Sequence, residues 1–437
     1  MHYGWPSPSL PQLLADNSTI PVTDSEGSWI AVMSLLSSTF SAVISALVLD
    51  VIGRKKTILL SCIPNLIAWI MIGFAESVTV ILGARFLAGL SDGLVFCALP
   101  MYLGETADPK VRGILGSTVT LAWITGILLI NIIGSYLSIS TTAFISIAFP
   151  VLCLITFVWM PESPYYLIMK ANVEQARKNL QLLKLTDDVE PHVERITKAV
   201  KDQHTNSGRY LDLFTVKSNR RAFGNALILR GAQQFSGTAA ITFYAQIIFE
   251  EAGESTAFSA SEASMIYFAV QLVLCACCSR IVDKIGRKPL LIFSIIGAGI
   301  ALFAEGSYFL ALDKADINLD NFTWIPLVAL IFYVIAFSFG MQTIPALMLG
   351  ELFPTNVKAF ALCLAFIYYA VVATLVSKFF QITKDSLGLF VPFYAFVGCC
   401  IVGLIFIIFF VVETKGKTLE EIQDELKGCD RKEDDRV

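Results

Sequence analysis

Long runs of apolar residues, each long enough to cross a lipid bilayer, constrain this chain of 437 residues more than any other feature. A membrane-spanning helix needs about 20 apolar residues to cross roughly 30 Å of hydrocarbon. The predicted spans are 28–49, 57–75, 78–103, 114–136, 141–160, 222–249, 263–282, 289–312, 324–349, 359–380 and 388–412. Composition agrees, since 55% of the residues are hydrophobic and only 16% are charged, against roughly 25% charged in soluble proteins. The chain is therefore predicted to be an all-α polytopic membrane protein in the lipid bilayer, and not a soluble enzyme.

The distribution of lysine and arginine predicts which ends of the spans face the cytoplasm. If Arg54, Lys55 and Lys56 lie in the cytoplasm and the sides alternate from there, 27 of the 32 cations fall on that side and 3 lie outside. Arg85 and Arg230 remain within spans. Because cytoplasmic loops of membrane proteins carry the excess of positive charge, this asymmetry fixes the expected topology. The net charge of −4 offers no basic field, so we expect no nucleic-acid partner.

Two further features agree with this topology. The N-x-S/T motifs begin at Asn17 and Asn321, both on the predicted outside, where glycosylation can occur. None of the ten cysteines lies outside, so no disulfide framework is expected. Cys275, Cys277 and Cys278 suggest either a metal or redox site or ordinary helix packing, and packing is favoured because no histidine is near. We expect no metal and no cofactor.

A set of charged motifs occurs twice in the chain. The segment Asp50–Lys55 recurs at Asp283–Lys288 with the same Asp, Gly, Arg and Lys positions. The second repeated element is a glutamate followed seven residues later by a cation, at Glu105 with Arg112 and at Glu351 with Lys358. The repeat therefore has the length of half the protein.

The repeat predicts four parts of the chain. These are an N-terminal helical bundle (1–160), a cytoplasmic linker with short helices (161–221), a C-terminal helical bundle (222–412) and a cytoplasmic tail (413–437). Two similar bundles joined by a cytoplasmic linker are the usual plan of a transporter that rocks around a site near the middle of the membrane.

Eight motifs occur in a fixed order along the whole chain. They are Gly53-Arg54-Lys55, Ala84-Arg85-Phe86, Glu105 with Arg112, Pro161-Glu162-Ser163-Pro164, Gln233-Gln234-Phe235-Ser236-Gly237, Gly286-Arg287-Lys288, Glu351-Leu352-Phe353-Pro354 and Glu413-Thr414-Lys415-Gly416. This order resembles the sugar porter family of the major facilitator superfamily. Residues 233–249 are most similar to the branch of insect facilitated trehalose transporters.

The resemblance implies a major facilitator fold with two pseudo-symmetric six-helix bundles. Residues 4–8 resemble the outer end of the first family helix, so eleven complete spans and a stub of the first are expected here. A truncated gene model is the preferred explanation, and a genuine shorter isoform is the alternative.

The resemblance also implies a function. We expect a monomeric, multi-pass plasma-membrane glycoprotein that carries a small neutral sugar, a trehalose-like disaccharide or a hexose, by facilitated alternating-access diffusion. The alternatives are a transport-inactive solute sensor and a proton-coupled sugar or polyol symporter. Several family sugar contacts are altered, since Ala239, Ala346 and Tyr369-Ala370 replace the usual Asn, Trp and Asn-Trp.

Polar residues predict the sugar site on the segment 222–249. Gln234, Thr238, Thr242 and Gln246 recur every fourth residue and would share one helix face. Such a stripe faces either a neighbouring helix or a wet cavity, since buried unpaired amides are costly. For Gln233 and Gln234, the family resemblance implies hydrogen bonds to sugar hydroxyls.

Three more residues occupy positions that the resemblance connects with the substrate. Gln271 lies near a family Asn or Gln, Thr120 stands where hexose transporters often have Gln, and Tyr244 matches an aromatic residue that closes over the sugar. Ordinary helix packing is the alternative for all three.

The repeated charges predict a latch at the cytoplasmic ends of the helices. Arginine has five fixed donors suited to carboxylates, and in the family such contacts hold the two halves together on the inside. The residues expected in this latch are Arg54, Glu105, Arg112, Asp283, Arg287, Glu351 and Lys358. Simple positive-inside anchoring is the alternative, but it does not explain the repeated carboxylates.

Arg85 and Asp92 are two further charges within a span, seven residues apart on one predicted helix face. Ionisable residues inside a membrane helix are costly and often functional. A structural role and a role in proton coupling both remain open for this pair, and facilitated transport is favoured.

Overall fold

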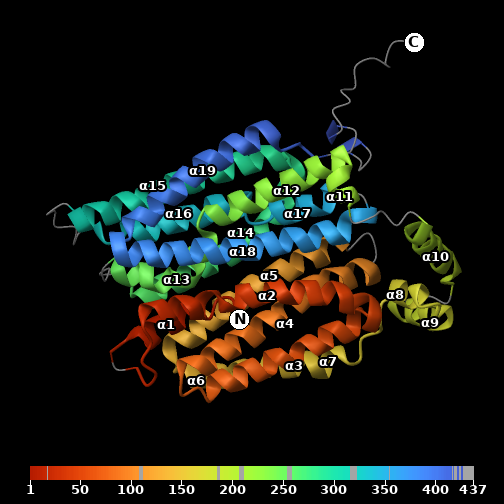
Figure 1. Cartoon of the computed structure of the whole chain (residues 1–437), viewed down its shortest axis with the longest axis horizontal. Helices are drawn as coiled ribbons and strands as arrows, with labels where there is room; N and C mark the ends of the chain where they lie inside the picture. The colour runs from red at the N-terminus through yellow and green to blue at the C-terminus, as the bar shows by residue number, and fades with distance from the viewer. Residues whose placement is uncertain are drawn as a thin grey trace, which may run out of the picture. The chain divides into compact units, whose positions relative to one another are not determined.

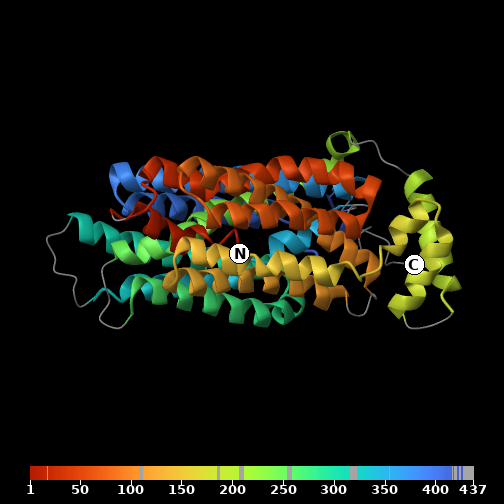
Figure 2. The same ribbon diagram turned by 90° about the horizontal axis from the view of Figure 1, so that it is seen from below.

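The structure, a computed structural model, describes residues 1–16, 18–107, 112–184, 188–205, 211–252, 258–314, 322–353, 355–415, 417, 421–422 and 425–426. Within these residues the regular secondary structure is helical (Figures 1 and 2). The helices are α1 (Pro6–Leu14), α2 (Asp24–Ile52), α3 (Arg54–Gly73), α4 (Val78–Thr106), α5 (Arg112–Tyr136), α6 (Ile139–Ser146), α7 (Ala148–Phe157), α8 (Pro164–Met169), α9 (Val173–Lys184), α10 (Glu190–Thr205), α11 (Asp212–Thr215), α12 (Lys217–Phe235), α13 (Thr238–Glu251), α14 (Ala260–Ile285), α15 (Arg287–Lys314), α16 (Ile325–Phe339), α17 (Ile344–Leu352), α18 (Thr355–Leu387) and α19 (Phe390–Phe410).

Ten of the predicted spans are confirmed as helices long and apolar enough to cross a membrane within the described residues. Their ranges are Asp24–Ile52, Arg54–Gly73, Val78–Thr106, Thr118–Tyr136, Ile139–Phe157, Ala260–Cys277, Arg287–Lys314, Ile325–Leu349, Phe360–Leu387 and Phe390–Phe410. The eleventh predicted span, 222–249, is also helical, but it is divided between α12 and α13.

The helices group into two compact units that cut across the predicted halves. Unit 1 contains Met1–Asn206, Ala239–Leu272 and Ala373–Lys378, and unit 2 contains Ser207–Thr238, Val273–Val372 and Phe379–Val437. The predicted division into bundles, linker and tail remains a prediction.

In unit 1, α4 packs against α2 and α3, and small residues allow the close approach. A Cβ on Gly89 would collide with the backbone of Ser34, and a Cβ on Gly93 would lie 2.7 Å from the carbonyl oxygen of Ser38. Since lipid gives no hydrophobic drive between helices, such small-residue contacts supply the packing energy of membrane bundles. They therefore define the α2–α4 interface.

Three short helices of unit 1, α8, α9 and α10, lie beyond one end of its long helices (Figures 1 and 2). They share a small apolar core that includes Ile168, Leu180 and Val193. The short helices expected within 161–221 are thus present, among them α9 and α10.

In unit 2, α15 packs against α16 and α19, again through glycines. A Cβ on Gly297 would lie 2.6 Å from that of Ala336, and a Cβ on Gly340 would lie 2.5 Å from the carbonyl oxygen of Leu290. These contacts hold α15 and α16 close together along their length.

Two breaks within unit 2 interrupt helices inside membrane-length apolar runs. Gly237 has φ +84°, which breaks the helix between α12 and α13, and the ring of Phe396 occupies the space of a Cβ there. The second interruption separates α16 from α17 at Gly340, and Pro345 lies in the first turn of α17. The hydroxyl of Tyr333 donates to the carbonyl oxygen of Ser236 at 3.2 Å and so satisfies one group at the first break.

Candidate functional site

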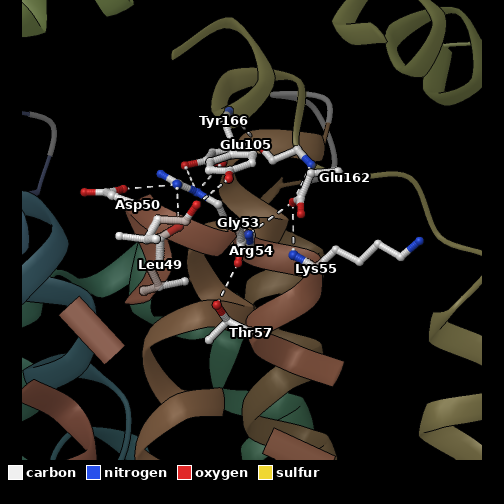
Figure 3. Close-up of polar contacts among 11 residues, drawn as sticks. Leu49, Asp50, Gly53, Arg54, Lys55, Thr57, Glu105, Glu162 and Tyr166 are labelled. Atoms are coloured by element: carbon white, nitrogen blue, oxygen red, sulfur yellow. Dashed lines mark hydrogen bonds and ion pairs between the residues drawn. The ribbon is translucent and has the colours of Figure 1, made fainter. Parts of the chain in front are cut away.

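Arg54, the first residue of α3, is the centre of a charge cluster in unit 1 (Figure 3). Its Nε lies 3.1 and 3.0 Å from the two carboxylate oxygens of Glu105. Its Nη1 donates to the carbonyl oxygen of Leu49 at 3.2 Å and to the carboxylate of Asp50 at 3.1 Å. The Arg54 residue is only 3% exposed, so these bonds compensate a charge that would otherwise be costly to bury.

Glu162 caps the same helix from the segment that follows α7. Its Oε1 accepts backbone N–H groups from Arg54 at 3.1 Å, Lys55 at 3.0 Å and Ser163 at 2.9 Å (Figure 3). The first N–H groups of a helix lack partners inside the helix, and a negative charge there also interacts favourably with the helix dipole. Gly53 has φ +100°, and a Cβ there would collide with this carboxylate. Glycine is therefore required at this turn for two reasons.

Unit 2 repeats this arrangement. Arg287, the first residue of α15, donates from Nη2 to Glu351 at 3.1 Å. The carboxylate of Glu413 accepts the backbone N–H groups of Arg287 at 3.0 Å, Lys288 at 2.9 Å and Lys415 at 2.9 Å. Burial raises the pKa of Glu413, but these N–H groups outweigh that effect and hold the pKa below its ordinary value.

The correspondence between the two clusters extends to their outer contacts. The hydroxyl of Ser163 donates to Glu105, and that of Thr414 donates to Glu351. The Nζ of Lys55 donates to the carbonyl oxygen of Val158 at 2.7 Å, and that of Lys288 donates to Ile408 at 2.8 Å. The structure thus contains the same capped turn twice, once in each unit.

The structure brings together two of the predicted charge pairs, Arg54 with Glu105 and Arg287 with Glu351. Lys358 is half-buried on α18, where burial lowers its pKa against the opposing effect of Glu351. The side chains of Arg112 and Asp283 lie outside the described residues, as do Asn17 and Asn321 of the predicted glycosylation motifs.

Gln233 is buried in α12 and its amide is fully engaged within unit 2. Its Nε2 donates to the carbonyl oxygens of Met341 at 2.7 Å and Gln342 at 3.3 Å, which lie in the break between α16 and α17. Its Oε1 accepts from Nη1 of Arg230 at 2.9 Å. Since broken membrane helices need partners for their freed carbonyl groups, Gln233 stabilises this break.

Gln234, the next residue, differs sharply from Gln233. It is 0% exposed, and neither its Nε2 nor its Oε1 has a hydrogen-bond partner among the described residues. An amide both donates and accepts hydrogen bonds, and burying one without partners costs roughly 2–7 kcal/mol. Gln234 is therefore an open polar group inside unit 2 that suits a ligand with hydroxyl groups.

The remaining predicted substrate residues fall in different places. Thr238 begins α13 and is half-buried, and it belongs to unit 2. Thr120 is half-buried on α5, while Tyr244 and Gln271 are 1% and 4% exposed, and all three belong to unit 1. The expected stripe from Gln234 to Gln246 is not one continuous helix face, because the backbone breaks at Gly237 and departs from helical angles again at Tyr244.

Comparison with known sequences identifies the family. Residues 9–426 match the sequence model of the sugar (and other) transporter family. The chain belongs to this family. It is 35% identical to the facilitated trehalose transporter Tret1 of Bombyx mori over 97% of this chain and 83% of that protein. It is also 35% identical to Tret1 of Anopheles gambiae and 33% identical to Tret1 of Aedes aegypti, each over 97% of this chain. It spans about half the length of these last two relatives, 53% and 52%.

Solved structures with the same fold are also transporters. The inward-open xylose transporter XylE of E. coli has a TM-score of 0.78 at 21% identity, and the proton:xylose symporter XylE bound to 6-bromo-6-deoxy-D-glucose has 0.77 at 22%. Each comparison covers 97% of this chain and 96% of the other. This family member therefore has the major facilitator fold predicted from its motifs, and it is a multi-pass membrane transporter, not an enzyme.

Arg85, in the second family motif, is 0% exposed in unit 1. Its acceptors are the carbonyl oxygens of His2, Ile30 and Ala31 and the hydroxyl of Ser34, at distances between 2.6 and 3.3 Å. The structure describes no ion pair between Arg85 and the half-buried Asp92. The contacts of Arg85 thus join α4 to α2 and to the N-terminal segment.

Glu162 and Glu413, the two helix caps, were not among the predicted site residues. Both close their half of the repeat, 251 residues apart, and each is followed by a hydroxyl residue, Ser163 or Thr414. That repetition was the available signal. No group of three potential metal-ligating side chains gathers in the part of the chain that the structure describes.

Proposed function

We propose that this transporter carries a sugar, a trehalose-like disaccharide or a hexose, by facilitated diffusion. The observation that carries the proposal is the buried amide of Gln234, which has no partner among the described residues. Sugar hydroxyls donate and accept hydrogen bonds, and an amide offers both functions. Trehalose is placed first because the named relatives are facilitated trehalose transporters.

We infer an alternating-access mechanism in which the two charge clusters form the inner latch. Each cluster fixes a short turn between two long helices, through Arg54 and Glu162 in one case and Arg287 and Glu413 in the other. In this mechanism each turn lies on the cytoplasmic side of its own rocking bundle, 1–160 or 222–412. The linker 161–221 and the tail 413–437 would then lie in the cytoplasm of a plasma-membrane monomer.

Facilitated transport is favoured over proton coupling by the surroundings of Arg85. Its guanidinium is satisfied by carbonyl and hydroxyl oxygens, and no direct ion pair among the described residues joins it to Asp92, the nearby carboxylate of the same helix. A proton-coupled pair needs a carboxylate that gains and loses its proton beside the arginine.

Net uptake into liposomes that contain the purified full chain, under an imposed inward proton gradient, tests the proposal. Labelled trehalose and glucose should enter saturably, reach equal concentrations on both sides and be insensitive to a protonophore. Empty liposomes are the control. Absence of saturable flux for both sugars contradicts the proposal, whereas uptake abolished by the protonophore indicates a symporter and binding without flux indicates a sensor.

A further inference from the structure

α12 carries a cation that neither charge cluster uses. Arg230 precedes Gln233 by three residues and Gln234 by four, and it is half-buried within an apolar stretch of the helix. Residues at these spacings are neighbours on one helix face. Arg230 therefore lies on the same face as both amides, and an ionisable residue inside a membrane segment is costly enough to indicate a function.

Among the described residues, Arg230 has few partners for its charge and no carboxylate. A guanidinium has five N–H donors, but in the part of the chain that the structure describes only Nη1 has an acceptor, Oε1 of Gln233 at 2.9 Å. Its Cζ lies 5.2 Å from the ring centre of Tyr369, and its Nε is buried without a partner among the described residues. No carboxylate forms an ion pair with Arg230 in the described part of the chain.

Arg85 provides the contrast within the same protein. Arg85 is 0% exposed, whereas Arg230 is half-buried, and three carbonyl oxygens and one hydroxyl accept the N–H groups of Arg85. A structural arginine in this protein is therefore saturated by local acceptors. Among the described residues, Arg230 is not saturated in this way.

We propose that Arg230 is a subsite for an acidic group of the transported solute, so that the chain accepts anionic sugars such as sugar carboxylates or sugar phosphates. This inference rests on the proposed function, in which the face of α12 that carries Gln234 lines the sugar path. Guanidinium groups bind carboxylate and phosphate through paired, charge-assisted hydrogen bonds. Gln234 then binds hydroxyl groups, Arg230 binds the acidic group, and Gln233 holds Arg230 in place.

The first test is a competition experiment, in which unlabelled acids compete with labelled sugars for uptake by the wild-type protein in liposomes. D-glucuronate and D-glucose 6-phosphate are added separately during uptake of labelled trehalose and of labelled glucose. At least one acid should inhibit more strongly than unlabelled glucose, and comparison of the two acids distinguishes a carboxylate ligand from a phosphate ligand. This measurement does not depend on the folding of a variant.

The second test measures how liposomes that contain the Arg230→Gln variant take up whichever acid competed, now in labelled form. The ratio of uptake efficiency for the acid to that for glucose should fall at least tenfold, because charged hydrogen bonds are lost. Arg230→Lys keeps the charge without the paired geometry and should lose less. Arg220→Gln is the matched control, since Arg220 is exposed on the same helix and the ratio should stay within twofold.

The outcomes separate this inference from the proposed function. If neutral sugars compete and neither acid does, or if Arg230→Gln lowers both efficiencies by the same factor, the subsite is wrong and sugar transport stands. If only the acids are carried and their uptake depends on Arg230, the subsite stands and neutral-sugar transport is wrong. If no sugar of either kind is carried or competes, both are wrong.

Discussion

Replacing Glu162 with alanine should destabilise unit 1 through the loss of one helix cap. The carboxylate accepts three backbone N–H groups at 2.9–3.1 Å, and two of them belong to the first turn of α3. A hydrogen bond to a charged group contributes about 1.5–3 kcal/mol when well formed, and the helix dipole adds about 0.3–1 kcal/mol. Because one oxygen serves all three donors and Glu162 is half-exposed, we expect a loss of about 2 kcal/mol for Glu162→Ala.

The prediction is tested by comparing the loss of stability in Glu162→Ala with that in two further variants. Glu162→Gln keeps a neutral acceptor oxygen, whose bonds contribute about 0.5–1.5 kcal/mol, so its loss should be about half that of alanine. The control is Glu174→Ala, which removes an exposed ion pair with Lys178 at 3.2 Å, an interaction that contributes about 0.5 kcal/mol or less.

Thermal unfolding of the detergent-solubilised protein measures these differences. A loss of 2 kcal/mol corresponds to roughly 4–8 °C for a cooperative unit of about 200 residues. The expected order of melting temperatures is wild type, then Glu162→Gln, then Glu162→Ala, with Glu174→Ala close to wild type. If Glu162→Ala melts with the control, the carboxylate does not cap α3 in the way described.

Three further predictions concern the amides and the second charge cluster. Gln234→Ala should raise the KM for sugar about three- to thirtyfold. The amide of Gln246 donates to Glu250 at 3.0 Å, so Gln246→Ala should change the melting temperature more than the KM. Equal losses of surface expression with an unchanged KM would show that both residues serve helix packing. Arg287→Ala should favour inward-facing forms and increase cysteine labelling at the cytoplasmic mouth, and unchanged labelling would leave only an anchoring role. The depressed pKa of Glu413 means that its contribution to stability is present above its unfolded pKa of about 4.3 and is lost as pH falls through the lower folded value. Glu413→Gln should therefore flatten the fall in melting temperature on acidification below about pH 4.5, and a wild-type slope in this variant would contradict the cap.

The spans, the charge repeat and two ion pairs were predictable from sequence because each depends on local pattern or on duplication. Apolar runs identify membrane helices through their length alone. The pairs Arg54–Glu105 and Arg287–Glu351 follow from carboxylates and cations at repeated positions. The resemblance of the motifs to the sugar porter family then predicted the major facilitator fold.

The two helix breaks and the caps were harder to predict for a different reason. The apolar run around Gly237 continues without a charge, so hydropathy gives no sign that the backbone turns there. Glu162 reaches α3 across 108 residues of sequence, and no local pattern reports such a contact. Likewise, the difference between Gln233 and Gln234 depends on the carbonyl groups exposed at a break in another helix, and it becomes visible only in three dimensions.

The capped turns have a mechanical consequence. At Gly53 and Gly286 the backbone has positive φ, and a carboxylate holds the first N–H groups of the following helix. Each turn is therefore rigid, and we expect the two long helices that it joins to move together as one rigid body. Motion inside unit 2 is then left to the interruptions at Gly237 and Gly340, where the backbone ladder is already open. A transporter built in this way bends at its broken helices and keeps its two capped turns rigid.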